Sequence, residues 1–120
     1  MLHRSDPDAI RAEQRRIIAE NMSEGEFQAL ILEYAKAHGW MASHSRPARR
    51  GDGSWNTPVA GDVGAPDLLL ARGGTVYLWE LKTERGRYRD GQTAWLAAIG
   101  PVIGATYRPS DLDRIYELLS

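Results

Sequence analysis

The sequence predicts an α/β domain with a central four-stranded sheet, and three observations lead to this class. Residues 24–38 repeat apolar side chains at helical spacing. Two strand-like runs, residues 67–72 and 75–82, are separated by two glycines, which is typical of a β-hairpin. A further helix, strand and helix follow, and such alternation indicates a sheet covered by helices. From residue 23 onward the expected order is therefore helix, strand, strand, strand, helix, strand, helix.

The length and composition are those of one soluble globular domain. The 120 residues are 42% hydrophobic and 26% charged, which allows a buried core and excludes a disordered chain. The absence of cysteine excludes disulfide frameworks, thiolate metal sites and cysteine nucleophiles. No apolar run approaches the roughly 20 residues of a membrane span, and no signal peptide is visible. We therefore expect a cytoplasmic protein without a membrane partner.

Residues 6–21 predict an accessory helix that precedes the main domain. Asp6 can cap this helix, and Pro7 suits its first turn. Few apolar side chains line it, so it offers little to a core. We therefore divide the chain into an accessory helix, residues 1–22, and a main domain, residues 23–120, and we expect no chemistry in the helix.

The main domain begins with the helix of residues 24–38, which Gly39 is placed to end. Residues 40–45 predict a short strand. Residues 46–66 are rich in Arg, Gly and Pro and predict a long loop. A loop of this length within a small domain is usually functional or mobile.

The remaining elements follow the hairpin. Residues 92–99 predict a short helix that ends at the next Gly-Pro pair, and residues 102–107 predict the fourth strand. Ser110 is expected to cap the last helix, with Asp113 in the capping-box position, and this helix should run to Leu119.

The predicted hairpin brings three charged side chains together. With the two glycines as its turn, Asp67 lies directly opposite Glu80, and their Cβ atoms are expected about 4.5–5.5 Å apart. Lys82 lies two residues beyond Glu80 and therefore points to the same face. A longer turn with another register would separate the pair. Both faces of the hairpin are otherwise largely apolar, so we expect both to be covered.

Two carboxylates this close repel each other, by roughly 3 kcal/mol at an effective dielectric constant near 20. Lys82 offsets part of that repulsion, and a divalent cation would offset more, because carboxylate oxygens are ligands that suit Mg²⁺. A third carboxylate, Glu26, lies one turn into the helix of residues 24–38 and borders its apolar stripe. We therefore favour a metal-dependent site over a structural ion cluster.

Each of these residues also has an ordinary structural explanation. An Asp at the start of a strand commonly caps a turn, and a Glu-x-Lys sequence on a strand is commonly a solvated alternation. Glu26 completes the sequence Ser23-x-x-Glu26, which is a capping box. The combination of all three at the end of a buried hairpin is what favours the metal site.

The same residues resemble the motif of the PD-(D/E)XK nucleases, in the form Pro66-Asp67, twelve intervening residues and then Glu80-Leu81-Lys82. More narrowly, residues 23–120 resemble the virus-type replication-repair nuclease family, VRR-NUC, in the small stand-alone form often seen in phages. The other residues that carry this resemblance are Glu26, Gln28, Gly64, Gly86, Gln92, Trp95 and the Arg-Pro-Ser-Asp sequence at 108–111.

The resemblance implies a restriction-endonuclease-like core, in which a mixed four-stranded sheet is flanked by helices. It also implies hydrolysis of phosphodiester bonds with Mg²⁺ or Mn²⁺ as the cofactor. By the same resemblance, the metal ligands are Asp67, Glu80, the backbone carbonyl of Leu81 and Glu26.

The resemblance further implies roles for two more side chains. Lys82 would position or deprotonate the attacking water and hold the scissile phosphate, and Gln92 would orient Lys82 or the phosphate. For Lys82 we favour positioning, because a lysine held beside two carboxylates is a poor general base. Small members of the family often act as homodimers on branched DNA such as Holliday junctions. We therefore expect a homodimer and a branched DNA substrate, in the host cytoplasm for a phage-encoded protein.

Arginines flank the carboxylate pair on both sides in the sequence. Ordinary solvated loop charge explains each of them as well as a phosphate contact does, but their grouping favours a groove that binds the DNA backbone. Trp55, in the long loop, either stacks on an unpaired base or anchors the loop. The candidate DNA-binding residues are Arg46, Arg49 and Arg50 before the hairpin and Arg85, Arg87 and Arg89 after it.

The expected function is that of a metal-dependent DNA endonuclease that recognises DNA structure rather than sequence. The alternatives are a catalytically silent nuclease-fold module that binds DNA and a purely structural interaction protein. The formal charge of −1 by itself argues against a basic nucleic-acid binder. It becomes +2 when the three proposed acidic ligands are left out of the count, so the charge balance does not exclude DNA.

Overall fold

The computed structural model shows an α/β fold built on a mixed four-stranded sheet, and it describes residues 6–45, 48–49, 55–56 and 61–120. Across the sheet the strands are, in order, β1 (Met41–His44), β4 (Leu68–Arg72), β5 (Thr75–Leu81) and β6 (Gly104–Tyr107). Strand β4 is antiparallel to both β1 and β5, whereas β6 is parallel to β5.

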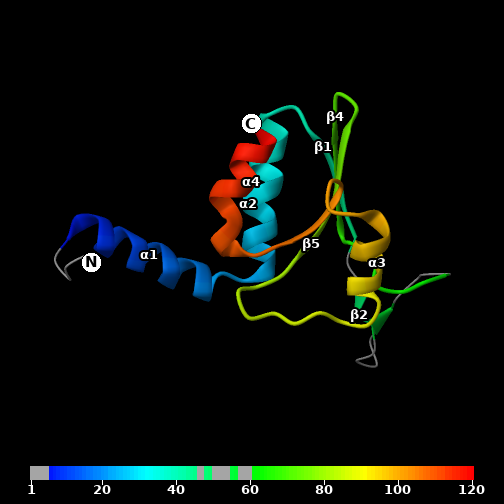
Figure 1. Cartoon of the computed structure of the whole chain (residues 1–120), viewed down its shortest axis with the longest axis horizontal. Coiled ribbons are helices and arrows are strands. Elements are labelled where there is room, and N and C mark those ends of the chain that lie inside the picture. The colour runs from blue at the N-terminus through cyan, green and yellow to red at the C-terminus, as the bar shows by residue number, and fades with distance from the viewer. Residues whose placement is uncertain (1–5, 46–47, 50–54, 57–60) are drawn as a thin grey trace.

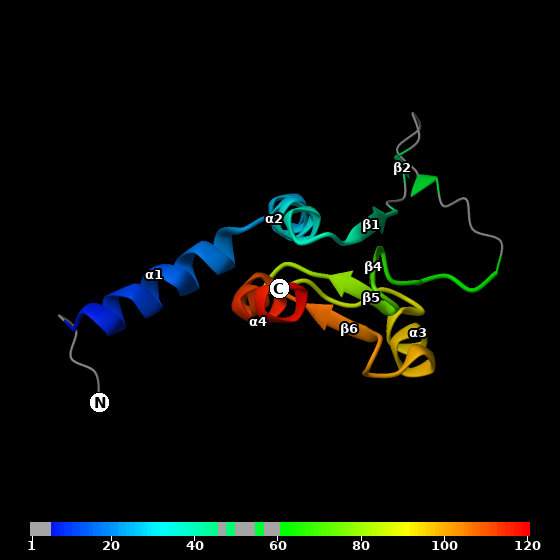
Figure 2. The same cartoon turned by 90° about the horizontal axis from the view of Figure 1, so that it is seen from above.

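Helices lie on both sides of this sheet. Helices α2 and α4 lie side by side against one face, and α3 lies on the opposite side (Figure 1, Figure 2). Helix α1 extends away from the rest of the molecule in both views. The helices are α1 (Pro7–Asn21), α2 (Glu24–Ala37), α3 (Gln92–Ile99) and α4 (Leu112–Leu119), with the 3₁₀ turn η1 (Pro109–Asp111) before α4.

The hydrophobic core lies between the sheet and the helix pair α2–α4. Phe27, Ile31 and Ala35 stand four residues apart on α2, so they share one face, and all three are fully buried. The apolar stripe predicted for this helix is therefore confirmed. The other core residues are Trp40, Leu68, Leu70, Trp79, Leu81, Ile115 and Leu119.

The predicted register of the β4–β5 hairpin is confirmed. Gly73 and Gly74 form its turn with φ values of 55° and 86°, a conformation that glycine adopts without strain. Arg72 pairs with Thr75, and the ladder continues without a bulge to the pair formed by Leu68 and Trp79. The residues that follow this last pair are the two predicted carboxylates.

The two faces of the sheet are covered unequally. On the face away from α2 and α4, Leu69 is 43% exposed, Val76 39% and Met41 78%. The expectation that helices cover both faces of the hairpin was therefore wrong for this part of the sheet. Helix α3 has only eight residues and packs beside β6, which is the edge strand farthest from β1.

The predicted caps of the first two helices are confirmed. The Asp6 side chain accepts a hydrogen bond from the backbone N–H of Asp8 at 2.8 Å. Ser23 and Glu26 form a complete capping box at the start of α2. Polar side chains of this kind satisfy the N–H groups that the first turn of a helix leaves unpaired.

The capping box predicted for the last helix was wrong. Pro109 begins the 3₁₀ turn η1, because its fixed φ and missing N–H suit a first helical turn. Asp111, rather than Asp113, closes the box by accepting a hydrogen bond from the backbone N–H of Arg108 at 2.8 Å. Helix α4 then begins at Leu112.

Two other segments differ from the prediction. The predicted long loop contains two short antiparallel strands, β2 (Ala48–Arg49) and β3 (Trp55–Asn56). Strand β6 begins two residues later than expected, because residues 101–103 form a turn. The first difference places Arg49 and Trp55 in strands rather than in a loop, and neither difference involves Asp67, Glu80 or Lys82.

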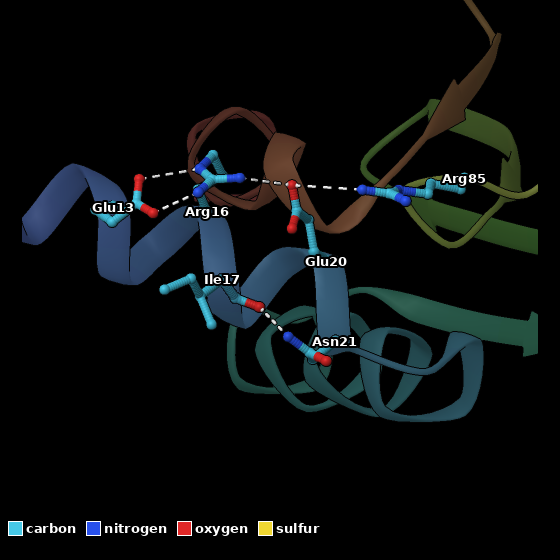
Figure 3. Close-up of polar contacts among 6 residues, drawn as sticks. All are labelled: Glu13, Arg16, Ile17, Glu20, Asn21 and Arg85. Carbon is cyan, nitrogen blue, oxygen red and sulfur yellow. Dashed lines mark hydrogen bonds and ion pairs between the residues drawn. The ribbon is translucent and has the colours of Figure 1, made fainter.

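Helix α1 is only lightly attached to the rest of the chain. Ala19 is its one buried residue among those described. Arg16 pairs with Glu13 and with Glu20, and Glu20 Oε1 also lies 4.0 Å from Arg85 Nη2 in the loop after β5 (Figure 3). Ion pairs as exposed as these contribute little to stability.

Candidate functional site

The candidate site lies at one end of the β4–β5 hairpin. Asp67 immediately precedes β4, Glu80 is the next-to-last residue of β5, and Lys82 follows that strand. The side chain of Glu80 is 3% exposed and that of Lys82 is 8% exposed. Lys82 Nζ lies 3.6 Å from Glu80 Oε1. The hairpin register therefore brings together the carboxylates and the ammonium group that the sequence predicts.

Asp67 has an unsatisfied oxygen. Among the described residues, its Oδ1 is the buried side-chain polar atom without a hydrogen-bond partner. Burial, followed by the charge of Glu24, raises the pKa of Asp67, while the N–H groups of Leu81 and of Asp67 itself oppose that shift. A buried acceptor without a donor is costly, so this oxygen is available for a ligand that carries positive charge.

Glu80 lies in surroundings that oppose its negative charge. Burial is the largest cause and the charge of Asp67 the second, and together they raise the pKa of Glu80 to about 7. The charges of Lys82 and Arg89 act in the opposite direction but do not cancel the shift. Two coupled carboxyl groups in a buried site are a recognised sign of function, although structural ion pairs produce shifts too.

Gln92 holds Glu80 in place. Its side chain is buried at the first residue of α3, and its Nε2 donates a hydrogen bond to Glu80 Oε1 at 2.7 Å. Its Oε1 accepts a hydrogen bond from the backbone N–H of Arg89 at 2.7 Å. Because a backbone N–H can only donate, this contact fixes the orientation of the amide. Gln92 thus orients Glu80, whereas the sequence suggested Lys82 or a phosphate as its partner.

A close backbone contact brings the Asp67 loop against the start of α3. A Cβ atom at Gly64 would lie 2.6 Å from the backbone carbon of Gly91, and a Cβ at Gly91 would lie 2.1 Å from the carbonyl oxygen of Val63. Both glycines have positive φ. Trp95 Nε1 also donates to the carbonyl oxygen of Asp62 at 3.3 Å. Glycine at both positions therefore sets how Asp67 lies relative to Gln92.

The structure does not bring Glu26 to the carboxylate pair. Glu26 is exposed, and its Oε1 accepts a hydrogen bond from the backbone N–H of Ser23 at 3.1 Å. The Ser23 hydrogen bonds lower the pKa of Glu26. Glu26 therefore serves the capping box, as the structural explanation of this residue required.

Glu24 is the α2 carboxylate that acts on the site. It is partly buried, and its charge raises the pKa of both Asp67 and Glu80. The sequence reasoning missed it, although a signal was present. Glu24 precedes buried Gln28 by four residues, so it extends the buried face of the helix.

The donor set can be compared with what a metal ion requires. In the part of the chain that the structure describes, no three His, Cys, Asp or Glu side chains are grouped closely enough to hold a metal ion. The coupled pair Asp67 and Glu80 nevertheless provides hard oxygen donors, one of them unpartnered. Such donors suit Mg²⁺ or Mn²⁺, which commonly take one or two protein carboxylates together with water and substrate oxygens. Leu81, whose carbonyl is another expected ligand, is fully buried beside the pair.

The predicted DNA-binding arginines fall into two groups. Arg85, Arg87 and Arg89 are exposed in the loop between β5 and α3, and the charge of Arg89 reaches Glu80. For the earlier group, Arg46 and Arg50 lie outside the described residues. The structure describes only the backbone of Arg49, in β2, and of Trp55, in β3.

Tyr88 is a further neighbour of the site that the sequence did not single out. Lys82 Nζ lies 5.9 Å from the centre of the Tyr88 ring, and the Tyr88 hydroxyl donates to Thr106 Oγ1 at 2.7 Å. This contact is at the outer limit for a cation–π interaction. Tyr88 therefore lies near the ammonium group, although it is itself 45% exposed.

The chain matches no protein-family model, and neither a curated protein nor a solved structure matches it. None of the helices among the described residues is both long and apolar enough to cross a membrane.

Proposed function

We propose that the protein is a divalent-metal-dependent DNA endonuclease that hydrolyses phosphodiester bonds in branched DNA, such as Holliday junctions. The observation that carries this proposal is the buried pair of Asp67 and Glu80, with an unpartnered Asp67 oxygen and with Lys82 beside it. Burying two like charges is unfavourable unless a positively charged ligand offsets their repulsion, and Lys82 and Arg89 together still leave the pKa of Glu80 at about 7.

The assignment to the VRR-NUC family and to a restriction-endonuclease-like core belongs to the same proposal. A mixed sheet with helices on both sides is compatible with it. Several residues that carry the resemblance also lie close together. Gly64 packs against the backbone of Gln92, and the Gln92 side chain donates a hydrogen bond to Glu80. A homodimer in the host cytoplasm, without a membrane partner, completes the proposal.

The proposed metal ligands are Asp67, Glu80 and the carbonyl of Leu81. Glu24 takes the place of Glu26 and acts on the metal through an intervening water, because no third acidic side chain is close enough to be a direct ligand among the described residues. When bound, Mg²⁺ or Mn²⁺ supplies an acidic water and neutralises charge on the phosphate. Lys82 holds the scissile phosphate and orients the attacking water next to Glu80. Gln92 keeps Glu80 turned toward Asp67, and the exposed arginines of the β5–α3 loop bind neighbouring phosphates.

A cleavage assay tests the function. Purified protein is incubated with four-way junction, splayed and linear duplex DNA, with Mg²⁺ or with EDTA. We expect junction cleavage that requires the metal and is lost in Asp67→Ala. Lys82→Ala should bind the junction but cut it at least a hundredfold more slowly. Glu117→Gln, which alters an exposed carboxylate of α4, is the control and should cut normally.

The other outcomes separate the alternatives. Salt-sensitive DNA binding without metal-dependent cleavage would overturn the endonuclease and support a silent DNA-binding module. No DNA binding even at low salt would support a structural interaction protein. Full activity in Asp67→Ala would show that any observed cleavage comes from elsewhere in the chain or from a contaminant.

A further inference from the structure

Three carbonyl oxygens of the segment that follows Lys82 converge on one side chain. Arg108 Nη1 donates to the carbonyl oxygens of Thr83 at 2.6 Å, Glu84 at 3.2 Å and Gly86 at 2.8 Å. Arg108 directly follows β6 and is half-buried. A guanidinium group is suited to this place, because it is always charged and offers several donors in one plane.

The same two stretches of chain are joined at further points. The backbone N–H of Lys82 donates to the carbonyl oxygen of Tyr107 at 3.0 Å. The N–H of Ser110 donates to Glu84 Oε1 at 2.6 Å. The backbone N–H of Arg108 is itself held by Asp111 in the capping box of η1. The backbone of Arg108 is thus held in place by Asp111, and its side chain holds the loop that follows Lys82.

The segment that Arg108 holds carries much of the positive charge near the site. Lys82 stands at its start, and Arg85 and Arg87 flank Gly86 with their side chains exposed. Glycine-containing loops have several accessible backbone conformations, so these cations would point in varying directions without a brace. Holding the loop in one conformation before DNA arrives reduces the entropy lost on binding.

We propose that Arg108 is a positioning residue, which holds residues 83–87 in the conformation that presents Arg85 and Arg87 to the DNA backbone. Arg108 acts through the loop and does not contact DNA. The role of Arg85 and Arg87 in binding DNA rests on the proposed function. The hold of Arg108 on residues 83–87 is a property of the free protein.

The first measurement is amide hydrogen exchange in the free protein, without DNA or metal. The Gly86 N–H, which donates to the carbonyl oxygen of Thr83 at 3.1 Å, should exchange at least tenfold faster in Arg108→Ala. Exchange at Leu70 in the core should not change. Arg108→Lys should restore only part of the protection, because its ammonium group can donate to these carbonyls but lacks the planar set of guanidinium donors.

The matched control is Arg114→Ala, which removes an exposed arginine of α4 that pairs with Glu117. It should leave the exchange of Gly86 unaltered. If the exchange at Gly86 is unchanged in Arg108→Ala, or changes equally in Arg114→Ala, Arg108 does not hold residues 83–87 in place. If Arg108→Ala fails to fold, Arg108→Gln keeps a neutral amide donor and takes its place in both measurements.

The second measurement separates positioning from a general loss of structure. Binding of a fluorescent four-way junction in EDTA is followed from low to high salt. Arg108→Ala should lower the salt dependence by about one to two phosphate contacts, as the double variant Arg85→Ala/Arg87→Ala does. Adding Arg108→Ala to that double variant should have no further effect, because the loop then has no cation left to place.

If the effects of Arg108→Ala and of Arg85→Ala/Arg87→Ala on junction binding are additive, Arg108 does not act by positioning these arginines. This holds even where Arg108 stabilises the loop. Absence of junction binding by the unaltered protein would overturn the proposed function and the DNA role of Arg108 together. The exchange measurement would then still decide whether Arg108 braces the loop, so the two failures can be told apart.

Discussion

The carboxyl group of Glu80 links the stability of the protein to pH. Its pKa is about 7 in the folded state, against an ordinary value of 4.5, so the folded state binds this proton more tightly than the unfolded chain does. Between these two pH values the free energy of unfolding therefore falls as the pH rises. Above pH 7 the loss of stability that comes from ionising Glu80 has reached its full size. A shift of this size corresponds to roughly 3 kcal/mol.

Glu80→Gln removes the titrating group and keeps an acceptor for Gln92. In EDTA at pH 8, we expect this variant to be more stable than the unaltered protein by up to about 3 kcal/mol. Near pH 4.5 the two should differ by less than about 0.5 kcal/mol, because the Glu80 carboxyl group is then neutral in the folded state and only half ionised in the unfolded chain. Urea denaturation at the two pH values measures this, with Glu117→Gln as the control. An equal effect at both pH values would contradict the assigned cause.

Glu24 and Glu26 provide a matched pair two residues apart on α2. If Glu24 acts on the metal through a bound water, Glu24→Gln should lower the apparent Mg²⁺ affinity of cleavage by tenfold or more, because a charged acceptor for that water is lost. Glu26→Gln should leave the Mg²⁺ dependence unchanged, since glutamine also completes a capping box. Titration of both variants with Mg²⁺ measures the rate and, independently, the metal-induced rise in Tm. The reverse order of effects would assign this role to Glu26 instead.

At the residue scale, the position of a side chain could be predicted from the sequence where local backbone geometry determines it. A two-residue turn fixes the hairpin register, and so Asp67 and Glu80 could be paired from the sequence. The choice between Glu24 and Glu26 depends on how α2 is rotated over the sheet, which long-range packing determines. The partner of Gln92 depends on where α3 lies, and a backbone contact with a distant loop sets that position.

Among the elements, the connection that leads into β4 depends on two glycines that touch. The contact between Gly64 and Gly91 leaves no room for a Cβ atom on either residue, and it fixes the start of α3 beside the Asp67 loop. An ordinary loop glycine is needed only for its dihedral angles, whereas this pair is needed for close approach as well.

Gly64→Ala and Gly61→Ala separate these two requirements. Both glycines have positive φ, but a Cβ atom at Gly61 would meet nothing within 4 Å. We expect Gly61→Ala to cost about 1 kcal/mol from backbone strain, and Gly64→Ala to cost about 1–3 kcal/mol more from overlap with the backbone of α3. Denaturant unfolding compares the two. Equal losses would show that the backbone contact relaxes without cost.

The limits of prediction at the element scale have local causes too. Asp6 and Ser23 were recognisable caps because each precedes a clear helical pattern. At the last helix, Ser110 offered an equally good capping sequence, but Pro109 began a 3₁₀ turn earlier and moved the cap to Arg108 and Asp111. Competing start signals one residue apart cannot be ranked from spacing alone.

On the scale of the whole molecule, α1 extends away from the rest of the fold (Figure 1). The radius of gyration is 16.5 Å, against about 13.6 Å expected for a compact domain of this length. Only Ala19 of this helix is buried. The main domain therefore has its core without α1.

Removal of the accessory helix tests this division. A chain of residues 22–120 should unfold cooperatively, with a free energy of unfolding within about 2 kcal/mol of the full chain, since little apolar area is lost. Met22 is retained because it packs against the core. Urea denaturation of both chains measures the difference. Loss of a cooperative transition would show that the helix belongs to the main domain.

The sheet order was the part of the whole fold that the residues alone did not provide. Helical and strand periodicity identified the four main strands, but periodicity does not tell which strands are neighbours. The β5–α3–β6 connection is a β-α-β unit, which joins parallel strands. Strand β1 pairs with β4 across a long connection, and no local signal in the sequence specifies that pairing.

The parallel pairing of β6 with β5 also bears on the order in which the chain folds. The β4–β5 hairpin closes a two-residue turn, so it can form early, whereas β6 joins only after α3 has been placed. Asp67 and Glu80 would then first meet in a hairpin that is still open to water, where their repulsion is screened. Their burial comes with the late docking of α3 and Gln92. Glu80→Gln is therefore expected to slow unfolding while leaving the folding rate nearly unchanged.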